Sequence, residues 1–139
     1  MNWVSDIEFD VDSNFGFIYL VEYENGKKYI GKKNFHSYRK KPLTKKELSF
    51  ITDKRLKSYR VVKTESNWRA YTGSCSLSKG LKLKEKRIIH VCKEKIDLTY
   101  WESFYLFTNE VLFDDTYLNQ NLEGRYFSGK LTGSKEHIK

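Results

Sequence analysis

The most informative segment is GFIYLVEYENGKKYIGKKN at residues 16–34. Two runs rich in β-branched and aromatic residues flank Glu24-Asn25-Gly26, and Asn-Gly is a strong signal for a tight turn between antiparallel strands. The segment therefore predicts a β-hairpin.

The length of the hairpin loop decides which side chains share a face. A two-residue loop puts Tyr19 and Tyr29 on opposite faces, because a shift of one residue turns a whole strand over. A three-residue loop with a left-handed Gly26 pairs Glu22 with Lys28 and puts both tyrosines on one face. We favour the three-residue loop, because the Glu22–Lys28 pair contributes about 0.2–1 kcal/mol.

Three further elements are expected beyond the hairpin. Thr44 and Glu47 have the spacing of a capping box, which predicts a helix running to about Val62. KRIIHVC at residues 86–92 predicts a third strand, and residues 99–113 predict the clearest helix. That helix is apolar over much of its circumference, which predicts that it is mostly buried. Its apolar residues are Leu98, Trp101, Phe104, Tyr105, Phe107, Val111 and Leu112.

The charge of the chain indicates a polyanionic partner. There are 26 Lys and Arg against 18 Asp and Glu among 139 residues, a formal net charge of +8. Each phosphate that a basic surface neutralises releases condensed counterions, so such a surface attracts nucleic acid. The basic residues gather between positions 32 and 63: Lys32, Lys33, Arg39, Lys40, Lys41, Lys45, Lys46, Lys54, Arg55, Lys57, Arg60 and Lys63.

Other classes of protein find no support in the sequence. Residues 1–15 carry four acidic groups and no basic one, unlike a secretory signal. No apolar run approaches the roughly 20 residues of a membrane-spanning helix. Cys75 and Cys92 form no CxxC pair, and we interpret them as reduced thiols of a cytoplasmic protein.

Five residues become candidates for chemistry when they are taken together: Tyr19, Tyr29, Arg39, Glu102 and Asn119. Each alone has a structural explanation. A strand tyrosine packs on a sheet, an arginine is solvated, and an asparagine ends a turn. Glu102 also stands three residues after Thr99, the spacing of a capping box.

The strings FIY at 17–19 and YIG at 29–31, joined across a tight turn, resemble the GIY-YIG nuclease family. Arg39 stands ten residues after Tyr29, Glu102 lies in the expected buried helix, and Asn119 follows it, as the family's arginine, glutamate and asparagine do. The block WRAYTGS at 68–74 is similar to a phage-encoded, homing-endonuclease-like branch. The resemblance spans about residues 16–125.

The chain departs from the family pattern at two places. Phe17 replaces the usual glycine of the first motif, and the basic stretch lengthens the interval between Tyr29 and Glu102. The catalytic arginine is therefore Arg39, Arg55 or Arg69, and Asn121 competes with Asn119.

The resemblance implies an endonuclease that hydrolyses DNA and leaves 5′-phosphate and 3′-hydroxyl ends. One carboxylate, Glu102, would hold Mg²⁺ or Mn²⁺, which keeps water and phosphate oxygens as further ligands. We assign Tyr29 as the base and Tyr19 to positioning the water, with Lys32 lowering the pKa of the base. DNA contacts are expected mostly to phosphates, because no predicted helix carries many groove-reading side chains. The expected contact residues are Lys32, Lys33, Lys40, Lys41 and Arg69.

The fold implied is α/β in the α+β sense, a small antiparallel three-stranded sheet flanked by helices in a single compact domain. We expect an N-terminal segment at 1–15, a nuclease domain at 16–126 with a basic insertion at about 32–63, and a tail at 127–139.

The oligomeric state is left open between monomer and homodimer. The main rival is a nucleic-acid-binding protein that retains the fold without catalysis. A basic protein associated with ribosomes or other nucleoprotein is a third interpretation.

Overall fold

The computed structural model describes residues 1–50, 59–73, 75–122 and 126–127. The chain divides into two compact units, one formed by Met1–Phe35 with Asn67–Lys139 and the other by His36–Ser66. The second unit falls almost entirely within the basic insertion expected from the sequence.

A four-stranded sheet forms the centre of the first unit, in the order β1-β6-β2-β3. The three antiparallel strands expected from the sequence are present, so the α+β fold is confirmed. A two-residue strand near the N-terminus adds in parallel to β6. The strands are β1 Val4–Ser5, β2 Gly16–Tyr23, β3 Lys28–Asn34 and β6 Leu83–Cys92.

The three-residue hairpin loop is confirmed. Glu22 pairs with Lys28 across β2 and β3. The Tyr23 N–H donates to the Lys27 carbonyl at 2.8 Å, and Gly26 has a φ of 85°. A glycine adopts this left-handed conformation without the steric cost that a side chain brings, so the loop sequence fixes the register of the hairpin.

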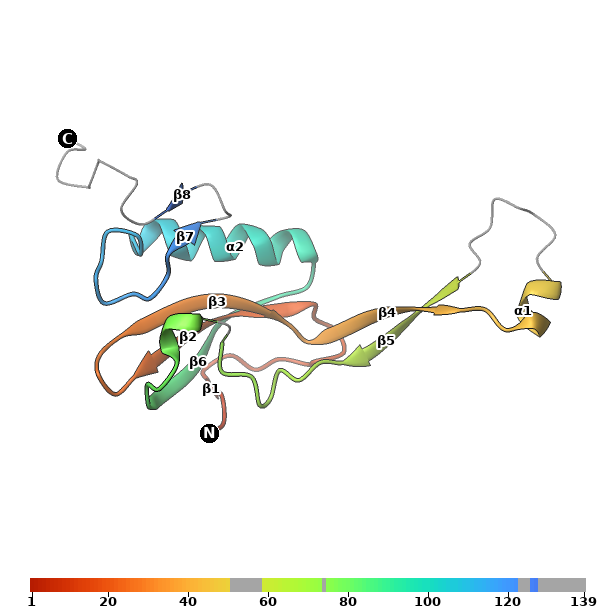
Figure 1. Ribbon diagram of the computed structural model, residues 1–139, viewed down its shortest axis with the longest axis horizontal. Helices are drawn as coiled ribbons and strands as arrows, with labels where there is room; N and C mark the ends of the chain where they lie inside the picture. Colours follow the sequence, from red (N-terminus) through yellow and green to blue (C-terminus); the bar gives the residue numbers. More distant parts are fainter. Residues whose placement is uncertain (51–58, 74, 123–125, 128–139) are drawn as a thin grey trace. The chain divides into compact units, whose positions relative to one another are not determined.

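The sheet has an aromatic face and an aliphatic face. The alternating residues Phe17, Tyr19, Val21 and Tyr23 of β2 face one cluster, which the N-terminal segment and Trp68 cover. The intervening Ile18 faces the other cluster, with Leu98 and Leu106 of helix α2, Lys95–Thr108. Figure 1 shows α2 lying along one face of the sheet. Because the side chains of a strand alternate, one central strand supplies both clusters.

Helix α2 differs from the expected helix in its bounds and its burial. It begins at Lys95 and ends at Thr108, and the residues after it form turns. The expectation that it is mostly buried is wrong, since only Leu98 and Leu106 among its side chains are buried. The helix covers the sheet with one side only. On its other side, exposed apolar residues remain: Ile96, Tyr100, Phe104 and Phe107.

The second unit contains two strands and a short helix: β4 His36–Pro42, α1 Lys45–Ser49 and β5 Tyr59–Glu65. The capping box of Thr44 and Glu47 is present. The prediction that its helix reaches Val62 is wrong, because β5 begins at Tyr59 and pairs with β4. Residues 51–58 lie outside the described part of the chain.

The remaining elements of the first unit are short. They are the 3-10 turn η1 Ser76–Ser78 and the pair β7 Asn121–Leu122 and β8 Tyr126–Phe127. Among the described residues, no helix has both the length and the apolar composition to cross a bilayer.

Candidate active site at the edge of the sheet

The two motif tyrosines lie next to each other on the aromatic face. Tyr19 is opposite Gly31, and Val21 is opposite Tyr29, so the tyrosines are diagonal neighbours across β2 and β3. Their ring centroids are 6.2 Å apart. The prediction that both project from the same face is confirmed.

Gly31 makes room for this pair. A Cβ atom at Gly31 would lie 2.6 Å from Cζ of Tyr19 and 3.0 Å from Cε1 of Tyr29, and would be closer still to the Tyr19 hydroxyl. The position therefore excludes any larger residue unless the rings move. Since β3 is the edge strand, the glycine of the second motif lets the Tyr19 hydroxyl reach the edge of the sheet.

Tyr19 is held in its neutral form. Its side chain is 1% exposed, and burial raises the pKa of its phenol far above the ordinary value. The neighbouring Tyr71, Tyr29 and Glu102 raise that pKa further. Tyr29 is half-buried and so more accessible to water. The geometry thus gives the two tyrosines different environments.

A third tyrosine and a buried lysine complete the aromatic side of the site, and sequence reasoning assigned neither a role. The ring of Tyr71 packs edge-on against Tyr19, with centroids 5.9 Å apart, and Lys33 Nζ lies 4.3 Å from the centroid of the Tyr71 ring. Lys86 is fully buried and donates hydrogen bonds to the carbonyls of Arg69 and Tyr71 at 2.9 and 3.0 Å. Its burial lowers the pKa of the ammonium. Lys86 therefore fixes the segment that presents Tyr71.

Glu102 approaches the same edge of the sheet from the opposite face. It lies on α2, which packs on the aliphatic face, and its Oε1 is 3.9 Å from Nζ of Lys32 on β3. Its negative charge is close enough to Tyr19 to raise the pKa of that phenol. The tyrosines and the carboxylate therefore approach edge strand β3 from opposite faces of the sheet.

The ammonium of Lys32 is directed to the α2 side. It donates to Thr99 Oγ1 at 3.3 Å and pairs with Glu102. Lys32 occupies the position opposite Ile18, on the face away from Tyr29. The sequence interpretation, in which Lys32 lowers the pKa of Tyr29, is therefore not supported by this geometry. Lys32 instead adjoins the carboxylate proposed to bind metal.

The alternative role of Glu102 in a capping box is wrong. Helix α2 begins at Lys95 with Glu94 as its N-cap residue, so Thr99 lies inside the helix. The hydroxyl of Thr99 donates to the Lys95 carbonyl within the same helix. Glu102 therefore has no capping function, and its carboxylate lies beside Lys32 at the edge of the sheet.

Asn119 is buried against β3. Its Oδ1 accepts from the N–H of Ile30 at 3.2 Å, and its Nδ2 donates to the carbonyl of Ile30 at 2.8 Å. Nearby, Lys28 exchanges backbone hydrogen bonds with Thr116 and Leu118. The segment containing Asn119 therefore covers the open edge of β3 between the two motif residues Tyr29 and Gly31. The competing Asn121 is exposed in β7.

We predict that Asn119→Ala lowers the free energy of unfolding by roughly 2–4 kcal/mol, because each unsatisfied buried backbone group costs about 1–3 kcal/mol. Asn2→Ala is the matched control, because Asn2 is exposed and a change within about 0.5 kcal/mol is expected at such a surface position. Urea unfolding measures both. Equal losses of stability in the two variants would contradict the structural role of Asn119.

The candidate arginines lie in different units. Arg39 is in β4 of the second unit, together with Lys40 and Lys41. Arg69 is in the first unit, where its guanidinium lies 4.4 Å from the centroid of the Trp68 ring. Arg55 lies outside the described residues. Arg69 is therefore the candidate that belongs to the same unit as the tyrosines and Glu102.

The donor atoms near Glu102 suit a hard cation. No group of three or more His, Cys, Asp and Glu side chains is gathered within the described ranges, so a cage made by the protein alone is not present there. A single half-buried carboxylate fits Mg²⁺ or Mn²⁺, because Mg²⁺ binds through one or two carboxylates and keeps water or substrate phosphate as its other ligands.

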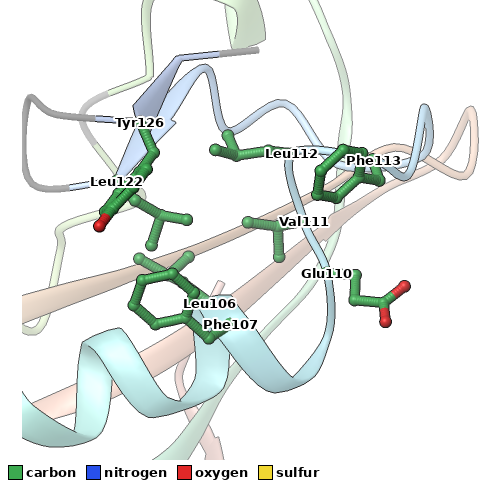
Figure 2. Close-up of a pocket in the computed structure, with 8 residues that line it drawn as sticks. All are labelled: Leu106, Phe107, Glu110, Val111, Leu112, Phe113, Leu122 and Tyr126. Atoms are coloured by element: carbon green, nitrogen blue, oxygen red, sulfur yellow. The ribbon is translucent and has the colours of Figure 1, made fainter. Parts of the chain in front are cut away.

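Two cavities of the first unit lie outside this cluster. One of about 310 Å³ is lined by the N-terminal segment with Trp68, Arg69 and Ile88. The other, of about 70 Å³, lies at the C-terminal end of α2 and is shown in Figure 2. Its lining is apolar, and the carboxylate of Glu110 points away from the other labelled side chains. This cavity contains neither Tyr19, Tyr29 nor Glu102, and its apolar lining offers no group for hydrolysis.

A comparison with protein families finds one match over most of the chain. The model described as "Putative endonuclease segE, GIY-YIG domain" matches residues 3–122. No curated protein and no solved structure matches the chain. The matched residues include both tyrosines, the glutamate and the asparagine described above.

Proposed function

The chain belongs to the GIY-YIG endonuclease family, and from this premise we propose that it is a Mg²⁺-dependent endonuclease that hydrolyses phosphodiester bonds of DNA. The observation that carries the proposal is the placement of the Tyr19–Tyr29 pair and of Glu102, paired with Lys32 of β3, on either side of this edge strand. A phage origin and action in the cytoplasm of the host cell belong to the same proposal and rest on the sequence resemblance.

The two tyrosines have different roles toward the attacking water: one accepts its proton and the other orients it. Tyr29, as its phenolate, accepts a proton from the water, because it is the more accessible of the two phenols and therefore the easier to ionise. Tyr19 stays neutral, because burial disfavours its phenolate, and its hydroxyl donates a hydrogen bond that orients the water. The position of Gly31 keeps the hydroxyl of Tyr19 at the strand edge, where a phosphate can approach.

Glu102 holds the metal ion in this proposal. The bound cation neutralises charge that develops on the phosphate and on the leaving oxygen. Lys32 lies beside Glu102, adds positive charge at the same edge, and moves from the carboxylate to a phosphate oxygen when DNA binds. One arginine makes a forked contact with the phosphate. Arg39 retains the family spacing, whereas Arg69 shares the unit of the tyrosines.

A plasmid assay tests the proposal. We expect supercoiled DNA to be nicked or linearised in Mg²⁺ or Mn²⁺, and to stay intact with EDTA. A nick with a 5′-phosphate and a 3′-hydroxyl is sealed by DNA ligase without further treatment. Binding of the plasmid without cleavage in either metal would reject the nuclease and favour the rival, a DNA-binding protein that retains the fold.

A further inference from the structure

Residues 36–42 and 59–65 of the basic stretch form a two-stranded antiparallel ribbon, and the described part of the expected helix is limited to α1. Strands β4 and β5 pair from His36 opposite Glu65 to Pro42 opposite Tyr59. Alternate residues of such a ribbon point to opposite faces. The change from helix to ribbon therefore changes which side chains act together.

One face of the ribbon, here called the basic ribbon face, carries cations and no acid. Arg39 lies opposite Val62, Lys41 opposite Arg60, and Ser37 opposite Thr64. Arg39 and Arg60 are diagonal neighbours, within reach of the same patch of ligand. The other face carries Tyr38, Lys40, Tyr59, Val61 and Lys63.

The cations of the basic ribbon face, Arg39, Lys41 and Arg60, are exposed to solvent. Within the described ranges, no side-chain hydrogen bond or ion pair holds them. Beside the hydrogen bonds of Thr44, the charge of Arg60 lowers the pKa of Glu47. By contrast, Lys40 on the other face lies 4.6 Å from the centroid of the Tyr59 ring. An isolated two-stranded ribbon gains little stability from packing, so its exposed cations point to a role in binding.

We propose that the ribbon enters the major groove of DNA and reads base edges with the basic ribbon face. The major groove, about 12 Å wide, admits a two-stranded ribbon, and the minor groove, about 6 Å wide, does not. Arg39 and Arg60 pair with O6 and N7 of guanine, and Val62 contacts a thymine methyl group. Arg69, in the unit of the tyrosines, is then the arginine for the forked contact with the phosphate. Lys40 and Lys63, on the other face, contact phosphates. The inference rests on DNA being the substrate, as proposed above.

Two double variants with equal loss of charge test this inference. Arg39→Ala with Arg60→Ala alters the basic ribbon face, and Lys40→Ala with Lys63→Ala alters the other face. Binding is measured in EDTA to a pool of duplexes with randomised central positions. Methylation of guanine N7 is scored for interference on the duplexes selected by the wild type.

We expect the wild type to enrich guanine-containing sites by about tenfold or more over the pool. Arg39→Ala with Arg60→Ala abolishes that enrichment and the interference by N7 methylation. Lys40→Ala with Lys63→Ala weakens binding to all duplexes alike and retains the enrichment. The inference is overturned if the wild type enriches no sequence, or if both pairs of substitutions reduce the enrichment equally.

The outcome is separable from that of the nuclease proposal, because no metal is present in the binding assay. Enrichment by a wild-type protein that does not cut plasmid in Mg²⁺ would leave the ribbon interface standing and reject the nuclease. Cleavage by a wild-type protein that enriches no sequence would support the nuclease and reject the ribbon interface.

Discussion

Glu102→Gln is expected to reduce DNA cleavage in Mg²⁺ by about three orders of magnitude or more. The metal ion contributes several kcal/mol of charge stabilisation in the transition state, and Glu102 is its proposed anchor. The variant removes one negative charge near the phosphate, so DNA affinity is expected to be unchanged or higher. Plasmid cleavage and equilibrium binding measure the two effects.

The matched control for this variant is Glu94→Gln. Glu94 is exposed at the start of the same helix, and its side chain makes no capping hydrogen bond. The substitution changes the net charge by the same amount, and cleavage is expected to stay within about twofold of wild type, as for an exposed surface change. If Glu102→Gln cleaved as fast as Glu94→Gln, Glu102 would have no part in the reaction.

Local signals in the sequence predicted the part of the fold that carries the tyrosines. Asn25-Gly26 fixed the loop, and the cross-strand pair of Glu22 and Lys28 selected the register that the structure has. Those two features place Tyr19 beside Tyr29, because the alternation of side chains leaves no other arrangement. The third strand and helix α2 were also predicted, with errors in their bounds and in the burial of the helix.

The sequence analysis did not predict the β4–β5 ribbon, because a genuine helix signal lies between its two strands. The capping box of Thr44 forms as predicted, but it fixes only one turn, and α1 ends at Ser49. Val61, Val62 and Thr64 are β-branched and favour a strand. Their partner strand lies about 20 residues earlier in the chain, at His36–Pro42, and a pattern of apolar residues within one segment does not reveal such a pairing.

Two features of the site depend on contacts between distant segments, which spacing alone does not predict. Asn119 binds the backbone of Ile30, 89 residues away in the chain. Lys86 is buried beneath the segment that contains Tyr71. Its position two residues before the buried Ile88 places both on one face of β6, and that alternation is the signal that identifies an inward-facing lysine.

The tyrosine pair allows the roles of the two phenols to be separated. Tyr29→Phe is expected to reduce the cleavage rate by about 10²–10⁴-fold, the usual contribution of a general base. Tyr19→Phe is expected to reduce it by about tenfold, a loss equivalent to one hydrogen bond to the water. Rates under saturating DNA and Mg²⁺ measure both effects.

The pH dependence distinguishes a base from a residue that only positions the water. In the wild type, the cleavage rate is expected to rise with pH as the base loses its proton. Burial raises the pKa of Tyr19 far above its ordinary value, so this phenol keeps its proton over the range of the assay. The rise should therefore persist in Tyr19→Phe and disappear in Tyr29→Phe. If the rise of the cleavage rate with pH disappeared in Tyr19→Phe instead, Tyr19 would be the base and Tyr29 the residue that positions the water. The buried phenol would then be the one that ionises.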